Sequence, residues 1–75
     1  LNNIGVIYTN LGQYVKALEL YQQALVIHRE IGDRKVESNT LNNIGGTYNS
    51  LGQYSKALDF HQQALVICRE IGNRA

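Results

Sequence analysis

The sequence repeats itself with a period of 40 residues, and this repeat restricts the possible folds more than any other feature of the chain. Shifting the chain by 40 positions aligns residues 1–35 with residues 41–75, and 24 of the 35 aligned pairs are identical. The chain contains no proline and shows no alternating strand pattern. A period of about 30–50 residues is then typical of a stack of helical hairpins. We therefore expect an all-α chain, an α-solenoid of antiparallel helix pairs.

Glycines divide each repeat into two helices. Apolar residues recur at helical spacing from residue 1 to residue 11, and Gly12 then interrupts the pattern, as Gly52 does in the second repeat. Gly32 suits a helix C-terminus, and Asp33 can cap the helix that follows. Four helices are expected, at about residues 1–11, 14–31, 34–51 and 54–71.

The second helix of each repeat carries two adjoining apolar seams. In the first repeat, one seam consists of Ala17, Tyr21, Ala24, His28 and Ile31, and the other of Leu20, Ala24, Ile27 and Ile31. A helix with two apolar seams packs against two neighbours, as an inner element of a stack does.

The repeat boundaries predict two units and two open ends. The first repeat spans residues 1–33, with its first helix truncated at the start, and the second spans residues 34–75. Because repeat arrays generally need about three units, we expect a two-repeat fragment of a longer array. The uncovered apolar seams predict self-association of the isolated chain, either head to tail or by exchange of a helix.

Composition excludes several classes of partner. The net charge is only +1 with no basic cluster, which argues against nucleic acid and against a membrane surface. No apolar run approaches the ~20 residues that a membrane span needs. Cys68 is the single cysteine, so no internal disulfide forms, and a lone thiol favours a reducing, cytoplasmic setting.

A recurring set of glycine, alanine and aromatic positions carries a family resemblance. In the first repeat the set is Leu1, Ile4, Gly5, Tyr8, Gly12, Tyr14, Ala17, Leu18, Tyr21, Ala24 and Leu25, and the second repeat matches it with His61 in place of Tyr21. This set resembles the tetratricopeptide repeat signature. Because Arg29 and Arg69 stand where the shorter form commonly has a helix-ending proline, the chain resembles the 40-residue variant in kinesin light chains, spindle-orientation adaptors and bacterial signalling proteins.

The resemblance has consequences for packing. It implies that small residues let the paired helices approach closely, with Gly5 and Gly45 facing Ala24 and Ala64. It also implies looser packing in the second repeat around His61, which replaces a bulky aromatic residue.

One face of each first helix is polar but uncharged. Residues 1–15 and 38–55 contain no Asp, Glu, Lys or Arg. Amide side chains both donate and accept hydrogen bonds, so they match a peptide bond in either orientation. The alternative is a low-charge face that merely tolerates amides or is covered by a neighbouring chain. The candidate face consists of Asn2, Asn3, Val6, Thr9, Asn10, Asn39, Asn42, Asn43, Gly46, Asn49 and Ser50.

The resemblance implies a function for this face, because the first helices of tetratricopeptide repeats line a concave surface that binds peptides. Asn3 and Asn43 match the family's backbone-clamping asparagine. The expected function is therefore a protein-interaction scaffold that binds an extended or helical peptide segment. The alternative is a structural or self-assembling module that uses its open ends.

Neither an active site nor a metal site is expected. Ser38 and Ser50 lack the sequence context of an activated nucleophile, and no cofactor motif is present. His61 and Cys68 lie seven residues apart on one helix face, as two metal ligands could. We favour a packing seam instead, with Cys68 as a small apolar residue and His28 half-buried with a satisfied hydrogen bond. The charges of the second helices, such as Arg29, are expected on a solvated convex surface.

Overall fold

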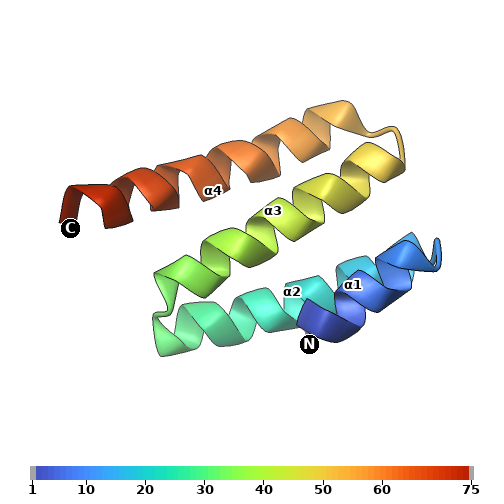
Figure 1. Ribbon diagram of the computed structural model, residues 1–75, viewed down its shortest axis with the longest axis horizontal. Helices are drawn as coiled ribbons and strands as arrows, with labels where there is room; N and C mark the ends of the chain where they lie inside the picture. The colour runs from blue at the N-terminus through green and yellow to red at the C-terminus, as the bar shows by residue number, and fades with distance from the viewer. Residues whose placement is uncertain (1, 75) are drawn as a thin grey trace.

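Four helices run in alternating directions along the chain (Figure 1). The computed structural model describes the backbone of residues 2–74 and the side chains of residues 4–72. The helices are α1 (Asn2–Asn10), α2 (Tyr14–Ile31), α3 (Arg34–Ser50) and α4 (Tyr54–Arg74). The expected all-α architecture is confirmed, and the bounds of the first three helices agree with the expected ones to within one residue.

Glycine makes the three tight turns possible. Gly12, Gly32 and Gly52 have φ angles of 79°, 82° and 76°, which lie in the left-handed region that other residues rarely adopt. After Gly32, the side chain of Asp33 accepts a hydrogen bond of 3.2 Å from the backbone N–H of Val36, as an N-cap does. The predicted helix end and the predicted cap at this turn are both confirmed.

The last helix is longer than expected. Gly32 ends α2, but its counterpart Gly72 lies inside α4, which continues to Arg74. At Gly32 the left-handed turn is held because α3 folds back onto α2 and is capped by Asp33. Gly72 has no such returning helix within the described residues, so it keeps the helical conformation that glycine also permits.

The core lies along α3, which packs against both α2 and α4. Leu41 and Ile44 of α3 are 1% and 0% exposed, and Tyr21 of α2 is 2% exposed. Stacked rings of Tyr48 and Phe60, with centroids 5.5 Å apart, extend the core between α3 and α4. Because α3 has neighbours on two sides, it holds more of the buried residues than any other helix among the described residues.

The expected seams of α2 are only partly buried. Ala17, Tyr21 and Ala24 are buried, but Ile27 and Ile31 are exposed. Leu25, which neither seam included, is buried at 7% exposure. Leu25 lies one helical turn after Tyr21, on the same face. The buried face of α2 therefore includes Leu25, whereas the predicted second seam included Ile27 and Ile31.

Glycine permits close approach of paired helices, although against different side chains from those expected. A Cβ atom placed on Gly45 would lie 2.8 Å from the ring of His61, and one on Gly5 would lie 2.5 Å from the ring of Tyr21. The glycines therefore accommodate the ring at the aromatic position of each repeat, whereas Ala24 and Ala64 were expected to face them. The ring of His61 fills the space beside Gly45, which argues against loose packing there.

The first helices are neighbours and the second helices are not. α1 packs against α2 and also contacts α3, but within residues 2–74 no Cα atom of α2 lies within 8 Å of one of α4. The first helices therefore lie closer to each other than the second helices do.

Candidate functional site

The uncharged residues of α3 form one continuous strip. At 100° per residue, six residues fall within about 120° of the helix circumference. They are Asn39, Asn42, Asn43, Gly46, Asn49 and Ser50. This strip lies opposite the buried residues Leu41 and Ile44. The side chains of Asn39, Asn42, Asn49 and Ser50 are exposed, and Asn43 and Gly46 are half-buried. We call this strip, together with the matching residues of α1, the amide face.

The α1 part of the amide face is more apolar. Val6 is 41% exposed, Asn10 is exposed and Thr9 is half-buried. Ile7, which the sequence analysis did not place in the site, is 56% exposed beside Val6. The side chains of Asn2 and Asn3 lie outside the described residues, so the structure places neither of these candidates.

Hydroxyl groups on the amide face bond to their own helices. Thr9 Oγ1 donates to the carbonyl of Gly5 at 3.0 Å, and Ser50 Oγ donates to the carbonyl of Gly46 at 3.3 Å. Such bonds to the preceding turn leave less hydrogen-bonding capacity for a partner. The side chains of Asn39, Asn43 and Asn49 have no hydrogen-bond partner within the part of the chain that the structure describes. The amides, rather than the hydroxyls, therefore remain available.

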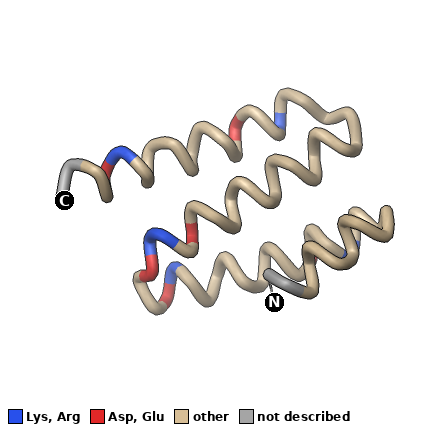
Figure 2. The backbone as a smooth tube through the Cα atoms, in the orientation of Figure 1, with Lys and Arg blue, Asp and Glu red and all other residues tan. Residues whose placement is uncertain are grey.

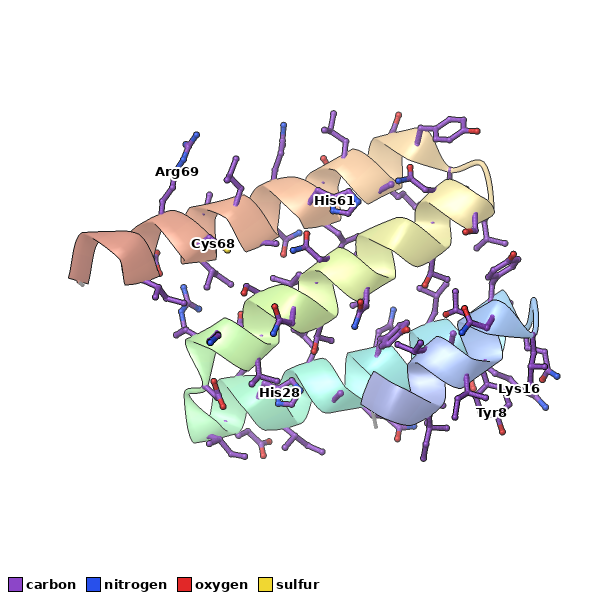
Figure 3. All side chains as sticks on the ribbon, in the orientation of Figure 1. Tyr8, Lys16, His28, His61, Cys68 and Arg69 are labelled. Atoms are coloured by element: carbon purple, nitrogen blue, oxygen red, sulfur yellow. The ribbon has the colours of Figure 1, made fainter. Side chains whose placement is uncertain are left out.

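Asn42 has a partner on α4. Its Oδ1 atom lies 3.0 Å from Nδ1 of His61, whose ring occupies the space beside Gly45 (Figure 3). This contact was not predicted from the sequence, because His61 was assigned to the seam of the second helix and Asn42 to the face of the first.

Charged side chains are absent from the described amide face. Figure 2 shows Asp, Glu, Lys and Arg around the α2–α3 turn and on α4, while α1 and the later part of α3 carry none. Gly46 leaves a gap in the strip, since a Cβ atom placed there would meet nothing within 4 Å. Beyond the end of α3, and outside the strip, an apolar hollow of about 330 Å³ is lined by Gly12, Gln13, Tyr14, Val15, Lys16 and Leu51. The described amide face is thus open and uncharged.

Comparison with known proteins identifies the repeat. A profile described as the tetratricopeptide repeat matches residues 1–70. The chain belongs to the tetratricopeptide repeat family. A search of curated proteins finds no match. Tetratricopeptide repeats are non-enzymatic scaffolds that generally mediate protein–protein interaction. No helix among the described residues is long and apolar enough to cross a membrane.

An ion-pair network that sequence reasoning missed joins the two tetratricopeptide repeats. Glu37 of α3 is 3% exposed and accepts hydrogen bonds of 3.2 Å from both Arg29 and Arg34. Arg34 also donates to Glu70 of α4 at 2.6 Å. This bond to Glu70, aided by the nearby charges of Glu37 and Glu70, raises the pKa of the Arg34 guanidinium above its ordinary value. Arg29 was expected on a solvated surface, but the returning α3 brings the buried carboxylate of Glu37 to it.

The two histidines and the cysteine do not converge. Nε2 of His28 is buried and has no hydrogen-bond partner among the described residues, which corrects the expectation of a satisfied histidine. Cys68, the counterpart of His28, is exposed on α4 rather than packed in a seam (Figure 3). Within the described residues, no group of three or more His, Cys, Asp and Glu side chains has an arrangement that could hold a metal ion.

Proposed function

We propose that this tetratricopeptide chain is a scaffold that binds a peptide segment of a partner protein along the amide face. The observation that carries the proposal is the strip of exposed, uncharged amides on α3, on the side where the first helices meet. A face that only contacted water would normally carry Lys and Glu, which are also better helix formers than Asn. A cytoplasmic setting fits the exposed lone thiol of Cys68.

The chemistry of the amide face suits a peptide backbone. Each free amide offers two N–H donors and one carbonyl acceptor, which is the complement of a peptide group. From Asn39 to Ser50 the strip is about 17 Å long at 1.5 Å per residue. About five residues of an extended segment, at roughly 3.3 Å each, cover that length. The gap at Gly46 has room for a partner side chain.

A library of random short peptides displayed on phage tests the proposal. Peptides selected on the unaltered chain should lose binding to Gly46→Arg, because the new side chain projects from the middle of the strip, where a Cβ atom meets nothing within 4 Å. The matched control is Gln62→Arg, which adds the same charge at an exposed position of α4. Equal binding to both variants, or no enrichment of any peptide, would contradict a peptide-binding amide face.

A specific observation favours self-assembly as a second function. Leu25 of α2 is 7% exposed under α3, whereas its counterpart Leu65 of α4 is 49% exposed. Ile44 of α3 is 0% exposed against α2 and α4, whereas its counterpart Ile4 of α1 is 47% exposed. The interface between the repeats has two sides, one on α2 and one on α3. The equivalent surfaces of α4 and α1 lie at opposite ends of the molecule, and both are uncovered. An α1 helix of a second copy fits α4 as α3 fits α2, which gives head-to-tail stacking.

A further inference from the structure

The contact between His61 and Asn42 gives one point of the amide face a defined hydrogen-bonding role. We infer that His61 is a positioning residue that fixes Asn42 as a hydrogen-bond donor, and that this donor binds a backbone carbonyl of an extended partner segment. The inference rests on the proposed peptide-binding function and adds the chemistry of the partner group. The observation behind it is the 3.0 Å distance between Nδ1 of His61 and Oδ1 of Asn42.

The structure places Oδ1, and not Nδ2, of Asn42 toward His61, and this orientation implies which atom carries the hydrogen. Oδ1 of an asparagine has lone pairs and no hydrogen, so it only accepts. In this orientation Nδ1 of His61 carries the hydrogen and donates it to Oδ1 of Asn42. With its oxygen engaged, Asn42 directs its NH₂ group away from His61, and because Asn42 is exposed that group is accessible on the amide face. Asn39 and Asn49 have no such anchor among the described residues, so their amides rotate freely between donor and acceptor.

The ring of His61 is itself held in place. It lies against Gly45, where a Cβ atom would come within 2.8 Å of it, and the ring is half-buried between α3 and α4 (Figure 3). A donor that is already oriented loses little side-chain entropy when a partner binds. Asn42 is therefore the amide that sets the register of a bound segment.

The first repeat uses the same position differently. In the first repeat, Tyr21 occupies the position equivalent to His61, and it is 2% exposed. The hydroxyl of Tyr21 lies 3.5 Å from Oγ1 of Thr9, the counterpart of Asn49 and not of Asn42. Tyr21 is thus a natural variant of the His61 position within the same chain, and its ring packs against Gly5 as the ring of His61 packs against Gly45.

A fixed donor selects the form of the partner. In an α-helix the carbonyls are bonded within the helix, except in its last turn. An extended segment presents unpaired carbonyls along its length. A single oriented N–H group at Asn42 therefore favours an extended segment, with one carbonyl directed at Asn42.

The tautomer of His61 in the unbound chain is the first test. Long-range ¹H–¹⁵N correlation spectra of the labelled 75-residue chain, at a pH where the imidazole is neutral, distinguish hydrogen on Nδ1 from hydrogen on Nε2. We expect His61 in the Nδ1–H form. The Nε2–H form would overturn the inference, because the amide of Asn42 would then donate to His61 and turn its carbonyl outward. Peptide binding on the amide face would survive that result, so the two proposals fail separately.

A carbonyl probe is the second test. N,N-dimethylacetamide accepts hydrogen bonds and has no N–H group, and its titration is followed at the side-chain ¹⁵N signals of Asn42 and Asn39. We expect a larger shift at Asn42 than at Asn39, and loss of the difference in His61→Tyr, which carries the first repeat's residue. Equal shifts at the two amides in the unaltered chain would overturn the inference.

Discussion

At the residue scale, two adjacent glycines of α3 have opposite surroundings. A methyl group at Gly45 meets the ring of His61, and one at Gly46 meets open space. Overpacking costs about 1–3 kcal/mol and outweighs the gain of about 1 kcal/mol for replacing a helical glycine. We expect Gly45→Ala to lower the free energy of unfolding and Gly46→Ala to raise it by up to about 1 kcal/mol. Urea unfolding measures both, and a shift in the same direction would contradict the geometry.

The same pair shows what sequence reasoning reached at this scale. Helical spacing placed Gly46 on the open face and Gly45 toward the partner helix, and both placements are correct. Spacing alone did not say that the ring of His61, rather than Ala64, would lie nearest to Gly45. Which side chain fills a gap depends on its length and rotamer, and helical periodicity contains neither. For the same reason the contact of His61 with Asn42 was not foreseen.

At the scale of the elements, the ion-pair network holds α3 against α2 and α4. Glu37 is buried, whereas the side chains of Arg29 and Arg34 are 52% and 39% exposed. In Glu37→Gln both arginines regain contact with water. We therefore expect the free energy of unfolding to fall by about 1.5–3 kcal/mol, which is the contribution of a hydrogen bond to a charged group. The control is Glu30→Gln at an exposed position, which should change stability little. Denaturant titration of the two variants compares them, and equal losses would show that the network adds nothing.

The bounds of the helices were predictable, but the contacts between helices were less so. Gly12, Gly32 and Gly52 mark the turns through a backbone requirement that is local to each residue. The pairing of Arg29 with Glu37 depends on how α3 returns across α2, which is not a local property. Asp33 caps α3 and Glu37 follows one turn later, so the acidic residues of this segment serve two different purposes. Sequence spacing distinguishes a cap from an exposed charge, but it does not identify a carboxylate that folding will bury.

At the scale of the whole molecule, identical residues have different surroundings in the two repeats. Leu25 is covered and Leu65 is open, although each follows an alanine at the equivalent position of the second helix of its repeat. Val26 and Val66, by contrast, are 55% and 53% exposed. Stacking of repeats therefore changes the exposure of the leucine and leaves the valine outside. This contrast identifies which exposed apolar residues belong to an interface and which belong to the outer surface.

Self-association of the 75-residue chain should therefore depend on Leu65 and not on Val66. Leu65→Glu places a charge where α3 covers Leu25 in the internal interface, and burying an unpaired charge is costly. We expect the unaltered chain and Val66→Glu to increase in mass with concentration, and Leu65→Glu to remain a monomer, as measured by light scattering. Both substitutions add one negative charge at exposed positions of α4, so net charge cannot explain a difference between them. If the unaltered chain is a monomer at every concentration, head-to-tail stacking is wrong and the amide face remains the proposed interaction surface. If both variants abolish association, copies meet through the outer face of α4 instead of through the repeat interface.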